Sequence, residues 1–475
     1  MNTPKKKTLS LFSLVMINVI AIDSLKTLST SAVYGLSLVF YFLLVALVFF
    51  IPMSLVAAEL ATGWPETGGI YVWAREAFGK KWGLFTMWLQ WFNNILWFLT
   101  IMTFIGATLA YCINPHLVDN PIYMLIVVLV FFWGATIVNF FGLSASSLLC
   151  TVAAVVGTLV PMILVAALAG VWMMMGKPIC LHFDWHSFFP DLSNINNLVL
   201  LTAMFYGLTG IEMSAIHAGD VENPQRNYPK AIFWSVTIIV STLIFASLAI
   251  ALVIPEQQIN IVSGLLQAFE VFFAAFHMSW MMPVIALLIV LSSVGIANAW
   301  ILGPSKGLLV ACHDQCISEK FGYQNKHAIP VTILLLQGAI FTILCAAFFL
   351  MPSVSSSFWL LTDVAAILQL MFYFMLFITA IKLRYKYPNV KRAFTIPGGK
   401  IGLWIVCGSG CIAALFTIFI GFLPPSQIPV GNLTTYELLI VAGIVICCTI
   451  PFVLYYKNAK NRTSVHMNGS VTSKE

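Results

Sequence analysis

Charged side chains are scarce in this sequence. Of its 475 residues only 8% are charged, while 60% are hydrophobic. Soluble globular domains carry about a quarter charged residues, so the composition excludes that class. The short alternating strands of a membrane β-barrel are absent as well. Instead, apolar runs of about eighteen or more residues recur along nearly the whole chain, which is typical of a polytopic helical membrane protein.

Metal-binding and catalytic motifs are also missing. The ten cysteines are scattered, mostly within apolar runs, where thiols pack as small apolar groups. No His-x-x-His, Gly-x-Ser-x-Gly or phosphate-binding loop lies at membrane depth, and no pore motif repeats. We therefore expect no cofactor, and a channel or a membrane enzyme is the weaker alternative to a transporter.

The hydropathy pattern predicts one polytopic domain, 9–456, between a short N-terminus, 1–8, and a short polar tail, 457–475, without regular structure. Twelve transmembrane helices are predicted within that domain. They cover 9–31, 36–60, 84–112, 122–141, 148–175, 198–218, 231–254, 280–308, 331–351, 358–383, 401–422 and 436–456.

Basic residues alternate from one connection to the next. The N-terminus, the tail and the second, sixth, eighth and tenth connections carry Lys and Arg, whereas Lys177 is the one such residue in the odd-numbered connections. The positive-inside rule then places both termini in the cytoplasm, and we expect the protein in the cell inner membrane. Because this distribution accounts for the formal charge of +6, we expect the lipid bilayer and no nucleic acid as partner.

Two connections have helical periodicity of their own. The segment 65–79 places apolar residues on one face with glycine at both ends, which predicts a short interfacial helix. The segment 261–276 predicts a further helix before the eighth span.

The sixth span contains Tyr206-Gly207-Leu208-Thr209-Gly210-Ile211-Glu212, an unfavourable sequence for an unbroken apolar helix. The first span contains a polar run from Asp23 to Ser31. Spans one and six hold corresponding positions in two five-helix halves, and interrupted helices at such positions indicate a secondary-transporter site. Backbone groups freed at the breaks can bind the carboxylate and the ammonium of an amino acid.

Few charges lie at membrane depth, and each has a structural alternative to a role in binding. Asp23 and Lys26 have the spacing of an intrahelical ion pair, and Lys26 with Asp363 is a second candidate pair. Glu212 is either a carboxylic acid hydrogen-bonded to neighbouring helices or a proton-coupled gate, and we favour the gate. Lys306 has the position of a lysine that extends to the membrane surface.

Several local sequences, in preserved order over essentially the whole chain, resemble the amino acid–polyamine–organocation superfamily, and within it the bacterial glutamate/γ-aminobutyrate (GABA) antiporters. They are 35–40, 57–62, 67–73, Gly210-Ile211-Glu212-Met213-Ser214-Ala215, Asn223-Pro224-Gln225-Arg226-Asn227-Tyr228-Pro229, Gly303-Pro304-Ser305-Lys306-Gly307 and Phe394-Thr395-Ile396-Pro397-Gly398-Gly399-Lys400.

The resemblance implies an all-α, five-plus-five inverted repeat with broken helices one and six, plus two extra helices. The repeats would cover about 9–175 and 198–383, and the extra helices 401–456. It also implies that spans one, two, six and seven move against a scaffold, that the breaks bind substrate, and that Glu212 is the gate. The predicted substrate-binding residues are Ile22, Asp23, Ser24, Lys26, Thr27, Tyr206, Gly207, Thr209, Gly210 and Ile211, and Asp363, Lys306 and Trp300 are candidates for pairing or support.

The expected function is therefore exchange of glutamate for GABA or a related amino acid or amine, with proton coupling and homodimer formation left open. The chain departs from the superfamily pattern at Asp23-Ser24-Leu25-Lys26, where a glycine-rich break is usual. Lys26 in the site favours a substrate with an extra carboxylate, whereas a free Asp23 or Asp363 favours a cationic amine. A carrier of basic or neutral amino acids, or of amines, is the alternative on the same fold.

Overall fold

The computed structural model describes residues 10–66, 68–141, 147–190, 193, 195–212 and 221–471, and these ranges are mostly helical, without a β-strand. They include ten helices long and apolar enough to cross a membrane, and a bent pair, Leu11–Ile22 with Leu25–Ala32, makes an eleventh span. All eleven coincide with predicted spans. The predicted sixth span, 198–218, contains the shorter helix Leu201–Gly207, and its residues 213–218 lie outside the described ranges. The all-helical class is confirmed, while the count of twelve stays a prediction.

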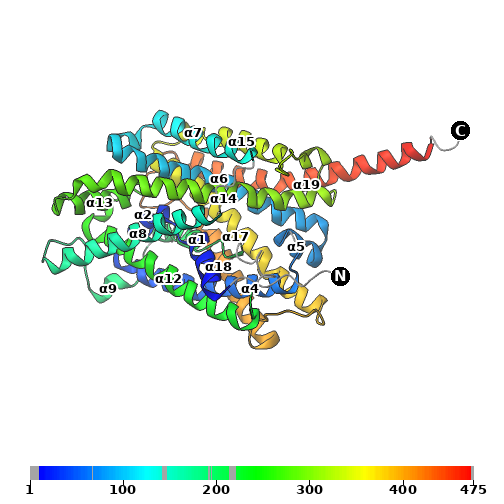
Figure 1. Ribbon diagram of the computed structural model, residues 1–475, viewed down its shortest axis with the longest axis horizontal. Coiled ribbons are helices and arrows are strands. Elements are labelled where there is room, and N and C mark those ends of the chain that lie inside the picture. The colour runs from blue at the N-terminus through cyan, green and yellow to red at the C-terminus, as the bar shows by residue number, and fades with distance from the viewer. Residues whose placement is uncertain are drawn as a thin grey trace.

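The long helices run roughly along one axis of the molecule, with α5 near one end and α9 and α13 at the other (Figure 1). We call these the α5 end and the α13 end. The helices are α1 (Leu11–Ile22), α2 (Leu28–Ala32), α3 (Leu38–Val45), α4 (Ile51–Gly63), α5 (Ile70–Phe78), α6 (Lys80–Ile113), α7 (Pro121–Phe140), α8 (Ser147–Met174), α9 (Trp185–Phe188), α10 (Leu201–Gly207), α12 (Pro224–Val253), α13 (Gly264–Ala275), α14 (Met282–His313), α15 (Val331–Leu344), α16 (Ala347–Leu350), α17 (Val354–Lys386), α18 (Gly399–Gly421) and α19 (Leu433–Val471).

Helices α6 and α17 form the centre of the bundle. In the most apolar 18-residue stretch of each helix, 78% is buried inside the protein, whereas the corresponding share in the last span, Leu433–Ala459, is 22%. Helix α6 packs against α14, α17, α5 and α7. Peripheral helices such as α18 and α19 instead expose large apolar side chains, as lipid-facing helices do. Polar side chains on α6 therefore face protein or a cavity.

The predicted helices in two connections are confirmed, and the prediction for the tail is wrong. Helix α5 starts after Gly69, which has a φ of 35°, and ends at Gly79, which has a φ of 95°. Helix α13 lies within 261–276. Helix α19 extends beyond the bundle to Val471 (Figure 1), so residues 457–471 are helical and not an unstructured tail. No proline or glycine interrupts the sequence between Tyr456 and Gly469, which explains the continuation.

A polar cluster fastens α5 to the end of α14. Arg75 Nη1 lies 2.8 Å from Asp314 Oδ2, and the Tyr71 hydroxyl donates to the same oxygen at 2.7 Å. Partial burial acts to raise the pKa of Asp314, but the hydrogen bonds from Arg75 and Tyr71 and the Arg75 charge hold that pKa below its ordinary value. The ionised carboxylate therefore holds α5 in place.

We expect Asp314→Asn to lower the free energy of unfolding by about 1 kcal/mol at neutral pH, because an ion pair at a partly exposed site is lost. A carboxyl whose pKa is lowered by folding stabilises the fold above its unfolded pKa, and this contribution is lost as the pH falls through the folded value. Below about pH 4 the difference between wild type and variant should therefore shrink. Thermal unfolding in detergent measures both effects, and the exposed Asp119→Asn is the control. A difference between wild type and Asp314→Asn that is the same at neutral pH and below about pH 4 would contradict this account.

Glu59 joins α4 to α17 near the α5 end. It is 1% exposed and accepts from Arg384 Nε at 2.7 Å and from the Ile396 backbone N–H at 2.8 Å. Arg392 Nε lies 3.5 Å from the same carboxylate. Glu59 therefore has a structural role, since two cations neutralise its buried charge.

Candidate functional site

The first span breaks where its polar run begins. Helix α1 ends at Ile22, and Asp23 and Ser24 are extended, with ψ of 117° and 122°. The chain resumes as a 3-10 turn, Leu25–Thr27, that leads into α2, and the two parts of the span are bent by 43°. The Thr27 hydroxyl donates to the Ser24 carbonyl at 3.0 Å. Short polar side chains of this kind compete with the helical hydrogen bonds, which explains why the break falls here.

The break in the sixth span lies directly beside it. Helix α10 ends at Gly207, and Gly210 has a φ of 120°, which favours glycine strongly. A Cβ atom on Gly210 would lie 3.0 Å from the Ala21 carbonyl oxygen, and one on Gly207 would lie 3.4 Å from the Thr27 side chain. The two glycines thus let the broken segments approach each other closely.

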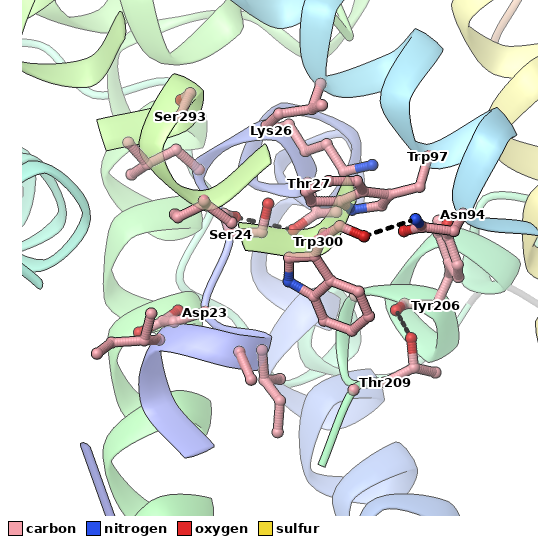
Figure 2. Close-up of a pocket in the computed structure, with 18 of the residues that line it drawn as sticks. Asp23, Ser24, Lys26, Thr27, Asn94, Trp97, Tyr206, Thr209, Ser293 and Trp300 are labelled. Carbon is pink, nitrogen blue, oxygen red and sulfur yellow. Dashed lines mark hydrogen bonds between the residues drawn. The ribbon is translucent and has the colours of Figure 1, made fainter. Parts of the chain in front are cut away.

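A central cavity lies at these breaks (Figure 2). Its walls come from both broken spans and from α6, α8, α14 and α17. The lining residues are Ile20, Ala21, Ile22, Asp23, Ser24, Leu25, Lys26, Thr27, Gln90, Asn93, Asn94, Trp97, Ile101, Phe104, Thr158, Tyr206, Gly207, Thr209, Gly210, Ser293, Ile296, Trp300 and Gln369.

Lys26 provides a buried ammonium group in this cavity. Its side chain is 3% exposed, and Nζ donates to Thr100 Oγ1 at 2.5 Å. Nζ also lies 5.4 Å from the ring centroids of both Trp97 and Tyr206, an arrangement that attracts a cation to the ring faces. A desolvated ammonium with one hydroxyl partner can still donate two hydrogen bonds, which suits a carboxylate.

Asp23 provides a carboxylate on another side of the cavity. Oδ2 accepts from Thr242 Oγ1 at 2.8 Å, and Oδ1 is buried without a hydrogen-bond partner in the part of the chain that the structure describes. Figure 2 shows Asp23 and Lys26 well apart, on either side of Ser24. Within the described ranges neither forms an ion pair. The cavity therefore offers one acidic and one basic group at separate positions.

Neither predicted structural pair involving Lys26 is present in the described residues. The break in the helix separates Lys26 from Asp23, so the spacing of an intact helix does not apply. Asp363 is fully buried away from the cavity and accepts from the Tyr436 hydroxyl at 3.3 Å. The pair with Asp23 assumed an intact helix across both residues, which the structure does not have, whereas the pair with Asp363 was based on predicted depth alone.

Glu212 lies just beyond the cavity. It is 2% exposed, and Oε1 accepts from Gln90 Nε2 at 3.2 Å. The Tyr373 hydroxyl donates to Oε2 and accepts from the Gly210 backbone N–H at 2.9 Å. No cation pairs with Glu212 among the described residues. The carboxyl group thus links the break in span six to α6 and α17 through hydrogen bonds alone.

The structure brings together most of the residues singled out in the sequence. Of the ten predicted substrate-binding residues, all but Ile211 line the cavity, and Trp300 lines it too. Ile211 is buried, and Asp363 and Lys306 lie elsewhere. Placement of a residue against the cavity is a geometric finding, and its role in binding stays a prediction.

Sequence reasoning missed the polar residues of α6. Asn93 accepts from the Tyr206 hydroxyl at 3.0 Å and donates to Gln369 at 2.6 Å, and Asn94 donates to the Trp300 carbonyl at 3.1 Å. Because only ionisable residues were considered at membrane depth, these amides were not selected. The signal was present, since Gln90, Asn93, Asn94 and Trp97 follow the i, i+3, i+4, i+7 spacing of one helix face.

The comparison with known protein families agrees with this geometry. The family model for amino acid permeases matches residues 7–447. The chain belongs to the amino acid permease family. This permease is 47% identical over 453 residues to an uncharacterized transporter of Legionella pneumophila, covering 95% of this chain and 97% of the relative. It is 32% identical over 461 residues to a glutamate/gamma-aminobutyrate antiporter of Lactococcus lactis, covering 96% and 91%. It is 24% identical over 374 residues to a polyamine transporter of Arabidopsis thaliana, covering 77% and 70%.

The match confirms the predicted superfamily and the multi-pass membrane character of the protein. The relatives named here are transporters, which agrees with the preference for a carrier over a channel or an enzyme. Amino acids are the class of substrate that the family description names for this permease, whereas polyamines are named for the Arabidopsis relative.

Proposed function

We propose that the permease exchanges glutamate for GABA or a close analogue across the cell inner membrane, by alternating access. The observation that carries this proposal is the buried ammonium of Lys26 in the central cavity, which has no ion-pair partner among the described residues. The relative named as a glutamate/gamma-aminobutyrate antiporter supports the same substrates.

Both proposed substrates carry an ammonium and a carboxylate separated by several carbons. GABA and the side-chain end of glutamate would place a carboxylate at Lys26, while the amino group would be received by Asp23 or by carbonyl groups freed at the break. Buried charges are stabilised when they are paired. A ligand with both charges would therefore supply ion-pair partners for Lys26 and Asp23, which have none among the described residues. We infer that Trp97, Tyr206 and Trp300 exclude water around the bound molecule.

The membrane orientation belongs to the proposal. We place the α5 end in the cytoplasm, because the basic residues near it satisfy the positive-inside rule. In this orientation Glu212 lies on the cytoplasmic side of the cavity and acts as the gate. Movement of spans one, two, six and seven against the scaffold would open the two sides in turn.

The second candidate is a carrier of cationic amines. It is favoured by the unpartnered Oδ1 of Asp23 and by the similarity to a polyamine transporter. A second cation beside Lys26 is less readily accommodated than a carboxylate, since like charges repel strongly where water is excluded. For this reason we rank the amine carrier below the exchanger.

Thermal stabilisation of the detergent-purified protein tests the two candidates with all amino acids, their decarboxylation products and agmatine. A ligand that binds the native state at 100 times its Kd raises the apparent stability by about 2.7 kcal/mol. We expect glutamate and GABA to raise the Tm and agmatine to leave it unchanged. Proteoliposomes should then exchange labelled glutamate for unlabelled glutamate or GABA. Stabilisation by agmatine alone selects the amine carrier, and no exchange of any amino acid from acidic to neutral pH rejects the exchanger.

A further inference from the structure

A second cavity lies on the α5 side of the central one. It is bounded by Gly68 and Gly69 before α5, by Gln90 on α6, by Glu212 and by Lys306 on α14. Gly68 and Gly69 have φ of 106° and 35°, so the backbone wall there is built from residues without side chains. The second cavity and the central cavity have one lining residue in common.

The shared member is Gln90, which lines both cavities. Its amide nitrogen donates to Glu212 Oε1 at 3.2 Å, and Glu212 lines only the second cavity of the two. The hydrogen bond between Gln90 and Glu212 thus lies where the two cavities adjoin, and we call it the Gln90–Glu212 partition.

Lys306 is the basic residue of the second cavity. Its side chain is exposed, and no ion pair, hydrogen bond or ring contact of its ammonium is found within the described ranges. Other cations at the α5 end are engaged: Arg75 pairs with Asp314, Lys80 donates to the Asp314 carbonyl and Lys386 donates to the Glu76 carbonyl. Unlike those residues, Lys306 faces a cavity whose other walls are largely apolar.

We propose that this cavity is a second binding site for the carboxylate of the substrate, with Lys306 as the residue that receives it after the Gln90–Glu212 partition opens. This proposal rests on the proposed function, which gives the substrate and the orientation in the membrane, and it adds a second substrate site on the cytoplasmic side. An exposed ammonium over apolar walls attracts an anion more strongly than one in bulk water. The site therefore selects amino acids over carboxylate-free amines on that side.

The test is the sidedness of the apparent KM in proteoliposomes with one orientation of the protein. We expect Lys306→Gln to raise the KM for glutamate about tenfold on the α5 side, the loss of one charge-assisted hydrogen bond, and to leave the KM on the α13 side within about twofold. Lys306→Arg should restore the α5-side value. The control is Lys320→Gln, which removes an exposed charge at the same end outside the cavity and should change neither value.

The outcomes separate this site from the proposed function. A wild type that exchanges no glutamate rejects the proposed function, and the same variants are then measured with whichever carboxylate substrate it does carry. An equal change of KM on both sides, an equal effect of Lys320→Gln, or no change for Lys306→Gln overturns the second site. A wild type that carries only amines without a carboxylate overturns it as well. An unaltered KM on the α13 side shows that the variant is folded.

Discussion

Glutamate exchange should fall about 100-fold in kcat/KM when Lys26 is replaced by glutamine. The physical reason is the loss of charge-assisted hydrogen bonds to the substrate carboxylate in a site without water, worth about 3 kcal/mol. Among the described residues the Lys26 ammonium has a single hydrogen-bond partner, Thr100, and Lys26 is 3% exposed. Uptake of labelled glutamate into proteoliposomes measures the effect, and glutamate should no longer raise the Tm of the variant.

The fold should tolerate this substitution. Lys26→Gln removes one hydrogen bond but also relieves the cost of burying an ammonium, so we expect the free energy of unfolding to change by less than about 1 kcal/mol. The matched control is Lys177→Gln. Lys177 Nζ also lies over two aromatic rings, 4.8 Å from Trp172 and 4.9 Å from Phe276, but at a distance from the cavity. Equal losses of exchange in the two variants would remove Lys26 from the site.

The Lys26→Arg variant separates the effect of the positive charge at this position from the effect of the shape of the side chain. The guanidinium keeps the charge, but it is larger and planar and cannot occupy the same position between Thr100 and the two rings without movement. We expect exchange to recover to within about tenfold of wild type. If Lys26→Arg and Lys26→Gln are equally inactive while both bind glutamate normally, Lys26 acts in the transport cycle and not in recognition.

The sequence was sufficient to predict the class of fold and the breaks in spans one and six, because both depend on local rules. The bilayer requires long apolar helices, and a polar run such as 23–31 or the glycines of 206–212 cannot lie in one without interrupting it. The correspondence of spans one and six then predicts that the breaks meet, which Gly210 and Ala21 do.

The partners of the buried charges could not be predicted in this way. The hypothesis of a Lys26–Asp363 pair used predicted depth alone, and depth does not specify the direction in which a side chain points. Thr100 and Trp97 lie about 70 residues away in the sequence, and their contact with Lys26 depends on the packing of α6 against the break. The tail was mispredicted for a different reason, since polarity was given more weight than the absence of helix-breaking residues after Tyr456.

Glu212→Gln should abolish the pH dependence of exchange. An ionised Glu212 accepts charge-assisted hydrogen bonds from Gln90 and Tyr373, and these hold the break in span six to α6 and α17. Protonation reduces those bonds to ordinary strength, a difference of about 2 kcal/mol or roughly 30-fold in rate. Wild-type exchange should therefore rise by up to this factor as the pH on the α5 side is lowered.

Glutamine has nearly the shape of the protonated acid but cannot titrate. Its oxygen can still accept from Gln90 or Tyr373, so the fold should be retained, and exchange by the variant should equal the acidic rate of wild type within about threefold at every pH. Proton-driven accumulation should be lost, because no proton is taken up and released at this position. Initial rates of exchange across a series from acidic to neutral pH measure the first effect, and accumulation under an imposed pH gradient measures the second.

The same substitution at Glu256 is the control, since Glu256 lies in the short turn Glu256–Gln258, outside the central cavity. Its variant should keep the wild-type pH profile. A Glu212→Gln protein with that same profile would show that another group titrates. A folded but inactive Glu212→Gln protein would show that ionisation itself is needed for movement, with the sign of the pH dependence reversed. A flat profile with preserved exchange is the result that only a titrating gate at Glu212 explains.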